Sequence, residues 1–389
     1  MKKFLALPFA ALFAAGCICT DEVKHTAKNE YVLREEMSSS KIYIENEFLK
    51  VSLLPELSGG VENVVLKSST LPLLRGGAYI LYSQGPLFVH PTASGVLYNE
   101  KFWNHANPGL TKMQTRIKTD SKVSFYASTY DIQPAALQRD ITVLPDSTIV
   151  KFDVTYTPHE GTKYITKGRI QPWLNLLASL DINWKAVIPG KGGLQVNGLG
   201  QKTDFPETGI YRKGTFGPNT FFTPARNWVA VTSAEKQVSL AIIHDQEKTC
   251  TIYSWQGLHE NRFARTIEFI FPDSAKSAND IRKYSYKIAV FTGIGDLQDI
   301  VQDTAIESRK ENGRLILRFS SARNVEAQKL AVSCKLNGKV TALKGTDKLP
   351  ALKTGKVVEA VYELPETLTR GELTVTWGKE SFTLLEEVK

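Results

Sequence analysis

The sequence predicts an all-β protein, on the strength of three observations. From residue 41 onward, short runs of residues alternate between apolar and polar with a period of two, as in KVSFYASTYDI. Turn-forming sequences such as Pro145-Asp146-Ser147 separate the runs. Long amphipathic helical patterns are almost absent. Alternation bounded by turn residues is typical of antiparallel strands, so we expect antiparallel sheets through most of the chain.

The larger block of this pattern covers residues 41–295, and a block of that length requires one large sandwich or barrel. The next segment, GDLQDIVQDTAIESRK, differs from it. Its apolar residues approximate one helical face, and Asp296 can cap the start. We expect this segment to form a linking helix over residues 296–311.

The final block, residues 312–389, returns to short, evenly spaced strands divided by turns. It is a small segment that contains no histidine. This size and pattern fit a small immunoglobulin-like β-sandwich. Because the block has no histidine and few aromatic residues, we assign it a packing or spacing role and no chemistry.

The first residues are typical of an export signal. Two lysines precede an apolar run, FLALPFAALFAA, that is too short to anchor comfortably in a bilayer. The sequence AAGC, which ends at Cys17, resembles a bacterial lipobox. We therefore expect residues 1–16 to be a lipoprotein signal peptide, Cys17 to be lipidated, and residues 17–40 to be a polar tether. Ile18 favours the outer membrane or the periplasmic side of the envelope, and a plain cleaved signal peptide is the alternative.

Charge and cysteine content bear on several classes of function. The formal net charge is +8, but Lys and Arg are scattered, with no basic block that would indicate nucleic-acid binding. A mildly positive protein could favour an acidic or sulfated glycan, and an ordinary soluble surface explains the charge equally well. Beyond the N-terminal region only Cys250 and Cys334 remain, without histidines at zinc-ligand spacing. We expect no metal ion and no cofactor, because the sequence also has no phosphate loop or dinucleotide fingerprint.

Three segments within residues 41–295 resemble those of a known family. IENEFLKVSLLPELSGGVENVVLKSSTLPLL is similar to an opening hairpin, Gly-Gly turn and following strand. LQRDITVLPDSTIVKFDVTYTPHEGTKYITKGRIQPWLNLLASLD is similar to central strands, and NWVAVTSAEKQVSLAIIHD to a later strand pair. The family is the galactose mutarotase-like superfamily of sugar proteins. The resemblance implies a supersandwich, two large antiparallel sheets stacked face to face, with a sugar cleft on the concave sheet.

The chain departs from this family at its catalytic positions. Glu62-Asn63 stands where the epimerases have an Asn-Arg pair after the glycine turn. The central sugar-facing strand GRIQPWLNL holds no histidine, and only His90 and His105 could replace the family's loop histidine. The chain therefore resembles exported lipoprotein relatives in the superfamily more than an aldose 1-epimerase.

The loop LFVHPTASGVLYNEKFWNHANPG is a candidate for sugar binding, because long ordered loops in β proteins are usually functional. The Trp103 ring could stack on the C–H face of a sugar. His105 could transfer a proton near neutral pH, and His90 could bind substrate. In the alternative interpretation, Trp103 is buried and His105 makes only local hydrogen bonds.

Two further segments supply binding candidates. Alternation in IQPWLNLL places Gln171, Trp173 and Asn175 on one face of a strand, with leucines on the other. Such a face suits a sugar cleft better than a dry core, although packing of the tryptophan is the alternative. In YRKGTFGPNTFFTPARNW, Arg226 could bind the carboxylate or sulfate of an acidic sugar, or it could be a solvated loop charge.

The segment YSWQGLHENRFART gathers aromatic and ionisable groups between two apolar runs. Trp255 and Arg262 are candidates for substrate binding. Glu260 is the candidate proton acceptor, kept ionised by Arg262, and His259 is a further acid/base candidate. Adjacent residues on a strand point to opposite faces, so His259 and Glu260 can serve one site only if they lie on a turn. Gly257 favours such a turn. A hairpin tip with solvent-exposed charges is the alternative.

These features predict a carbohydrate-active envelope lipoprotein that binds a glycan in the concave cleft. Epimerase-like or lyase-like proton transfer would need only an acid and a base from Glu260, His105 and His259, with Arg226 or Arg262 to neutralise a uronate. A polysaccharide lyase, a glycoside hydrolase and an epimerase-like enzyme all fit this set. The alternatives are a non-catalytic glycan-binding protein of a polysaccharide utilisation system and a structural envelope protein. The expected partners are a carbohydrate and, through the lipid anchor, a membrane, but not nucleic acid.

Overall fold

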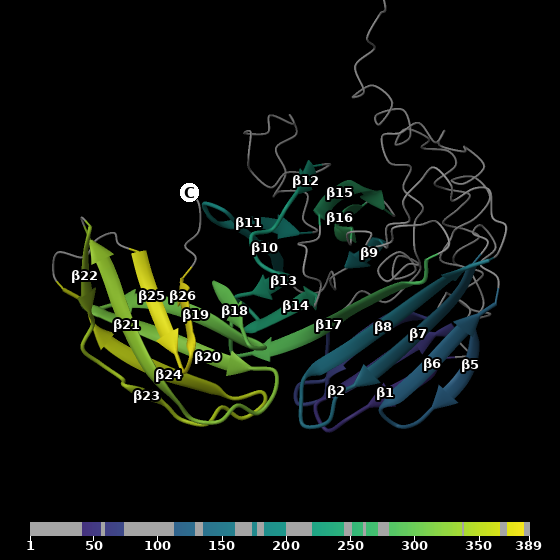
Figure 1. Cartoon of the computed structure of the whole chain (residues 1–389), viewed down its shortest axis with the longest axis horizontal. Helices are drawn as coiled ribbons and strands as arrows, with labels where there is room; N and C mark the ends of the chain where they lie inside the picture. The colour runs from purple at the N-terminus through teal and green to yellow at the C-terminus, as the bar shows by residue number, and fades with distance from the viewer. Residues whose placement is uncertain are drawn as a thin grey trace, which may run out of the picture. The chain divides into compact units, whose positions relative to one another are not determined.

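The computed structural model describes the chain in segments, and the regular elements within them are strands (Figure 1). The described residues are 41–55, 59–73, 113–128, 135–159, 173–176, 183–199, 220–244, 251–259, 262–270, 280–336, 338–365 and 372–384. No helix in these segments is long and apolar enough to cross a membrane. The sheets are antiparallel, which confirms the all-β prediction.

The first sheet is a meander of four strands. In spatial order they are β1 (Ile42–Glu45), β2 (Leu49–Leu54), β3 (Gly60–Leu66) and β4 (Leu71–Pro72). Asn46 shapes the β1–β2 turn, because its side-chain oxygen accepts hydrogen bonds from the backbone N–H groups of Phe48 and Leu49, both at 2.8 Å. Its amide nitrogen donates to the carbonyls of Leu144 and Ser147, each at 2.7 Å. The same residue thus makes the turn and ties this sheet to residues 144–147.

The second sheet has nine strands. In spatial order they are β11 (Gly193–Leu199), β10 (Trp184–Gly190), β13 (Trp228–Ser233), β14 (Val238–His244), β17 (Arg282–Thr292), β8 (Ile149–Pro158), β7 (Ala135–Val143), β6 (Lys122–Ala127) and β5 (Gln114–Lys118). Figure 1 shows β17 running beside β8 and β14, although these strands are far apart in sequence.

Apolar cores cover both faces of the middle of this sheet. Every residue of β13 and β14 is buried, which explains their nearly unbroken apolar sequences. On one face, Val229 and Val231 join the core formed with the first sheet. On the other face, Trp228 and Ala230 join a separate core with apolar residues of the segment 294–305.

The third sheet has four strands. In spatial order they are β12 (Thr220–Phe222), β15 (Thr251–His259), β16 (Arg262–Ile270) and β9 (Trp173–Leu176). β15 and β16 form a long hairpin that is paired along its whole length, from Thr251 opposite Ile270 to His259 opposite Arg262. Residues 223–227 lead from β12 into β13, so they connect this sheet to the nine-stranded one.

The helix predicted over residues 296–311 is wrong. This segment forms the strands β18 (Asp299–Val301) and β19 (Thr304–Glu311). Gln302 and Asp303 between them have positive φ angles of 50° and 62°, the conformation of a two-residue hairpin turn. The apolar residues of this segment are spaced as on a helix because successive ones pack into two different cores. Ile300 packs in the core behind the nine-stranded sheet, whereas Ile306 packs in the C-terminal core.

The C-terminal region consists of two sheets around a core of their own. One sheet has the order β18, β19, β20 (Arg314–Ser321) and β24 (Val357–Glu363). The other has the order β22 (Lys339–Ala342), β21 (Gln328–Leu336), β25 (Glu372–Trp377) and β26 (Glu380–Thr383), with β23 (Lys348–Leu349) paired to β21. This arrangement, which we call the C-terminal sandwich, agrees with the small sandwich predicted here. Its immunoglobulin-like character and the domain boundaries stay predictions.

Candidate functional site

Half of the residues predicted from the sequence lie outside the described residues, and their roles stay predictions. They are Cys17, His90, Trp103, His105, Gln171 and Glu260. The structure does place Trp173, Asn175, Arg226, Trp255, His259 and Arg262. Of these six, five belong to the sheet β12–β15–β16–β9, and Arg226 lies in the connection that follows β12.

The strand register places those five residues on one face of the sheet. In an antiparallel sheet, directly paired residues share a face, and so do residues two apart along a strand. Asn175 of β9 pairs with Glu268 of β16, which in turn pairs with Tyr253 of β15. We call the resulting surface the candidate face. Its positions are Trp173, Asn175, Phe221, Thr251, Tyr253, Trp255, Gly257, His259, Arg262, Ala264, Thr266, Glu268 and Ile270.

The opposite face of the same sheet has a different composition. Most of its positions are large and apolar: Leu174, Leu176, Phe222, Ile252, Leu258, Phe263, Ile267 and Phe269. A face whose positions are mostly large and apolar is typical of the core-facing side of a sheet. By register the candidate face holds two tryptophans, an asparagine and ionisable residues, which are residue types that suit a sugar.

Sequence analysis missed two residues of the candidate face, Tyr253 and Glu268. Directly paired residues on neighbouring antiparallel strands are about 5 Å apart, and diagonal neighbours are about 7–8 Å apart. By register, Glu268 is a direct neighbour of Tyr253 and Asn175 and a diagonal neighbour of Trp173 and Trp255. Glu268 is thus the carboxylate at the centre of the predicted binding residues.

The segment TIEFIFP held a signal for this residue. Glu268 is the single charged residue of TIEFIFP, where it stands between the apolar Ile267 and Phe269. A charge inside such a strand marks its polar face. The sequence could not show which residues on other strands it would meet, because that depends on register.

The candidate face is long in the strand direction. Tyr253 and His259 are six residues apart on β15, so at a rise of about 3.3 Å per residue they are roughly 20 Å apart. His259 and its partner Arg262 therefore cannot act on the same bond as Glu268. The small residues Gly257 and Ala264 are paired between these two ends of the face.

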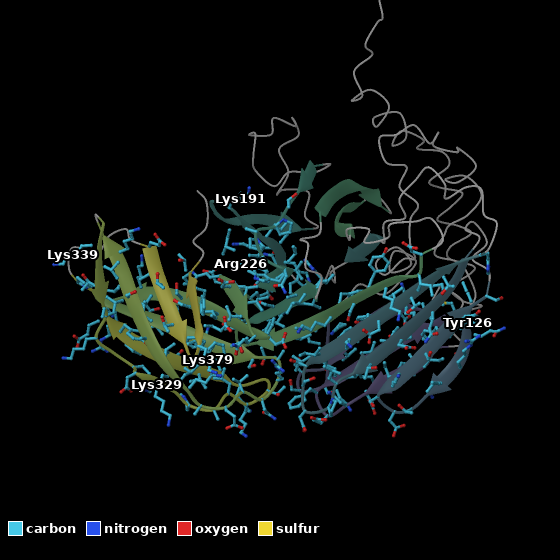
Figure 2. All side chains as sticks on the ribbon, in the orientation of Figure 1. Tyr126, Lys191, Arg226, Lys329, Lys339 and Lys379 are labelled. Carbon is cyan, nitrogen blue, oxygen red and sulfur yellow. The ribbon has the colours of Figure 1, made fainter. Side chains whose placement is uncertain are left out.

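Arg226 belongs to a different environment. Its Nη2 lies 4.0 Å from Oδ2 of Asp299, and the Arg226 side chain is 40% exposed whereas that of Asp299 is 1% exposed (Figure 2 labels Arg226). Burial raises the pKa of the Asp299 carboxyl to about 6, and Arg226, the Ile300 N–H and the Trp228 indole act in the opposite direction. In this structure the Arg226 guanidinium faces the buried carboxylate of Asp299. The role of Arg226 in binding an acidic sugar stays a prediction.

Within the described residues, no group of three or more His, Cys, Asp or Glu side chains could hold a metal ion. Cys334 is a buried free cysteine in the C-terminal core.

No family model matches the sequence, and no curated protein matches it. Solved structures do show similarity. A TPR-domain containing protein from Parabacteroides distasonis is 13% identical with a TM-score of 0.42, and the match covers 65% of this chain and 47% of that one. This chain therefore spans about half the length of that protein.

Two other neighbours have names that refer to carbohydrates. A galactose mutarotase-like protein from Lactobacillus casei is 16% identical with a TM-score of 0.38, and the match covers 64% of this chain and 100% of that one. A heparan sulfate lyase from Pedobacter heparinus is 11% identical with a TM-score of 0.36, over 78% of this chain and 39% of that one. Galactose mutarotase-like proteins are thus among the structural neighbours of this chain.

Proposed function

We propose that this protein binds an extended glycan along the candidate face and performs acid/base chemistry on it, with Glu268 as the base. The observation that carries the proposal is the strand register. It brings Trp173, Asn175, Trp255 and Glu268, from three strands, into one neighbourhood.

The acid/base pair follows from proximity. A carboxylate can remove a proton from a sugar carbon or hydroxyl, and a phenol can return one. Tyr253 is directly opposite Glu268 in register, at about 5 Å, which is closer than any other ionisable position of the face. We therefore assign Glu268 as proton acceptor and Tyr253 as proton donor, in an epimerase-like or lyase-like reaction.

The distance to His259 and Arg262 selects an extended substrate. A single sugar ring at Glu268 would not reach residues roughly 20 Å away along the strands. An oligosaccharide that follows the β15–β16 hairpin would reach them, after crossing Trp255 and the small pair Gly257 and Ala264. Arg262 would then bind an acidic substituent of a distant sugar.

The test is incubation of the chain lacking residues 1–19 with neutral, uronate and sulfated oligosaccharides of increasing length. Unsaturated products, new reducing ends and epimerised sugars are measured together with thermal stabilisation. We expect product from oligosaccharides and none from monosaccharides, and Glu268→Gln should abolish it. Glu260→Gln is the matched control, and loss of activity in that variant alone would return the role of base to Glu260.

A non-catalytic glycan-binding protein is the second candidate, supported by the two tryptophans that register places diagonally on either side of Glu268. Aromatic platforms of this kind bind sugars without chemistry. In that case glycans would raise the melting temperature of the protein without product, and Glu268→Gln would bind as well as the unmodified chain.

We also propose that the protein acts as an exported lipoprotein at the outer membrane or the periplasmic side of the envelope. The lipobox-like sequence that ends at Cys17 supports this location. Cell fractionation of the unmodified chain and of Cys17→Ser provides the test. The unmodified chain should sediment with membranes and the variant should be released, whereas equal release of both would refute the anchor.

A further inference from the structure

Asp299 is an unusual carboxylate because it is buried and incompletely satisfied. Its Oδ1 accepts a hydrogen bond from the Ile300 N–H at 2.8 Å. Its Oδ2 is buried and has no hydrogen-bond partner among the described residues, and the nearby Trp228 indole N–H likewise makes no hydrogen bond of standard geometry there. The cation that opposes Asp299 is Arg226, at 4.0 Å.

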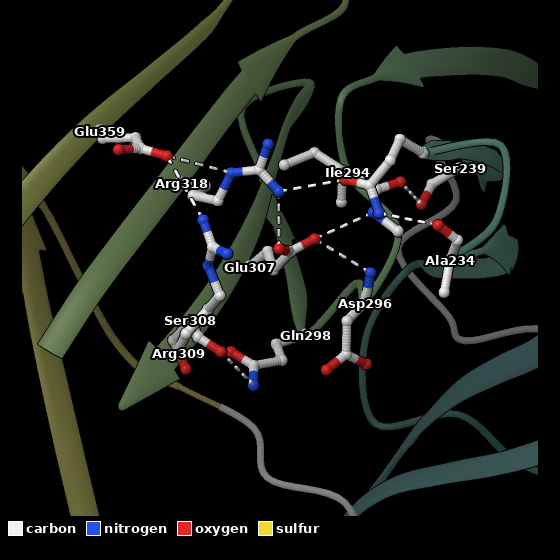
Figure 3. A network of polar contacts seen from close by, with 12 residues as sticks. Ala234, Ser239, Ile294, Asp296, Gln298, Glu307, Ser308, Arg309, Arg318 and Glu359 are labelled. Atoms are coloured by element: carbon white, nitrogen blue, oxygen red, sulfur yellow. Dashed lines mark hydrogen bonds and ion pairs between the residues drawn. The ribbon is translucent and has the colours of Figure 1, made fainter. Parts of the chain in front are cut away.

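Glu307, the second carboxylate of the β18–β19 hairpin to be considered, has hydrogen-bond donors on both of its oxygens. Glu307 accepts hydrogen bonds from the N–H groups of Gly295 and Asp296 at 2.9 Å and 3.0 Å, and from Arg318 at 2.8 Å (Figure 3). Arg318 also donates to Gln237 in the β13–β14 turn at 3.2 Å. Through Arg318, Glu307 is therefore linked to the turn at one end of the β13–β14 hairpin.

Asp299 lies near the opposite end of the β13–β14 hairpin, at the start of β13, where it faces Arg226. Arg226 precedes β13 by two residues and follows β12 by four. The residues before and after Arg226 are both hydrogen-bonded to the nine-stranded sheet. The Ala225 N–H donates to the Pro189 carbonyl at 2.6 Å, and the Asn227 side-chain amide donates to the His244 carbonyl at 3.1 Å. β12 is one of the two edge strands of the sheet that bears the candidate face.

We propose that Asp299 is a positioning residue for the candidate face: through Arg226 it fixes the connection from β12 to β13, and it releases that connection when it becomes protonated. The C-terminal sandwich would then be a working part of the binding site. The effect on glycan binding rests on the proposed function, whereas the positioning of β12 does not.

The charges around Asp299 favour such a response to pH. Arg226 comes from the β12–β13 connection, and Ile300 and Trp228 contribute uncharged groups. The next carboxylate, Asp303, has its own cations, Lys287 of β17 at 2.6 Å and Arg323 at 3.2 Å. Protonation of Asp299 therefore removes the charge that faces Arg226 and leaves the neighbouring ion pairs in place. With its pKa raised to about 6, this change falls in a mildly acidic range.

Hydrogen exchange of the full-length chain tests the positioning without any ligand. In Asp299→Asn at pH 7.5, we expect the amides of residues 220–226 to exchange roughly fivefold faster than in the unmodified chain, the effect of losing one partly exposed ion pair. Arg226→Gln should give the same acceleration, and the double variant should add nothing further. The unmodified chain should show this acceleration at pH 5, after correction for the intrinsic exchange rate, and Asp299→Asn should not.

Asp303→Asn is the matched control, because it removes a buried carboxylate of the same hairpin that does not face Arg226. It should lower the melting temperature without a selective effect on residues 220–226. The proposal is overturned if Asp299→Asn leaves exchange in 220–226 unchanged, or if it accelerates exchange equally across the nine-stranded sheet. Weaker glycan binding by Asp299→Asn would extend the positioning to the site. A chain that binds no glycan would count against the proposed function only, since the exchange result stands by itself.

Discussion

Two regions of this protein contain carboxylates within β-strands, but in different surroundings. On the C-terminal sandwich, Glu307 accepts two backbone N–H groups and an arginine, and its side chain is only 6% exposed. On the candidate face, Glu268 is paired in register with an asparagine and a tyrosine, with no cation directly opposite. A carboxylate whose acceptor capacity is filled by the protein serves the fold. We propose that Glu268, whose register partners are an asparagine and a tyrosine, serves a ligand instead.

Asp299 stands between these cases. It is as buried as Glu307, yet one of its oxygens has no hydrogen-bond partner among the described residues and its arginine lies at 4.0 Å. The comparison teaches that burial alone does not define the role of a charge. The number of donors that reach a carboxylate decides whether it locks a structure or responds to its surroundings.

The largest expected effect separates the candidate face from the C-terminal sandwich. Glu268→Gln should reduce the turnover of a reactive glycan roughly 100-fold or more, because it removes the general base. Its melting temperature should stay close to that of the unmodified chain. Steady-state rates and thermal unfolding measured on the same preparation check this. A variant that is inactive because it is unfolded would place Glu268 with the structural carboxylates.

Arg318→Ala should instead destabilise the fold and leave the chemistry intact. Removal of this arginine leaves Glu307 buried without its cation, at a cost of about 3 kcal/mol in the free energy of unfolding. Urea denaturation measures the change. Equal stability of the variant and the unmodified chain would show that the two backbone N–H groups satisfy Glu307 by themselves.

The pH dependence of stability should identify Asp299. Its pKa is raised in the folded state from 3.8 to about 6, so the folded chain binds an additional proton between these values. Global unfolding transfers Asp299 to water, so the global stability that this group contributes is fully present below about pH 4 and is lost as pH rises through 6, by about 3 kcal/mol. The proposed release of residues 220–226 is a separate local change, because it breaks the contact with Arg226 while Asp299 stays buried. In urea denaturation from pH 4 to pH 7.5, Asp299→Asn should lack this decline, and a decline of the same size in the variant would assign it to other groups.

The smallest effect is expected at an exposed ion pair. Lys151 and Asp153 lie 3.0 Å apart on β8 with side chains 41% and 47% exposed. Lys151→Ala should change the free energy of unfolding by less than about 0.5 kcal/mol, because water screens the pair. A loss as large as that of Arg318→Ala would mean that donor count and burial do not separate structural charges from surface ones in this chain.

Local patterns in the sequence were enough for the strands and for part of the candidate face. Alternation of polar and apolar residues predicted the all-β class, and it also predicted that Trp173 and Asn175 share one side of a strand, as the register bears out. The same kind of pattern failed at residues 296–311. There the apolar residues belong to two cores, and two consecutive positive φ angles make a hairpin in place of a helix.

The sequence by itself determined which residues alternate and which stretches turn, because these depend on neighbours along the chain. It could not determine that Glu268 lies between Asn175 and Tyr253, or that Arg226 meets Asp299, because these pairs are far apart in sequence. Their proximity follows from strand order and register, which are set by the packing of whole sheets. The tertiary structure therefore decided which carboxylate lies among the sugar-binding candidates and which one ties the C-terminal sandwich to the edge of that face.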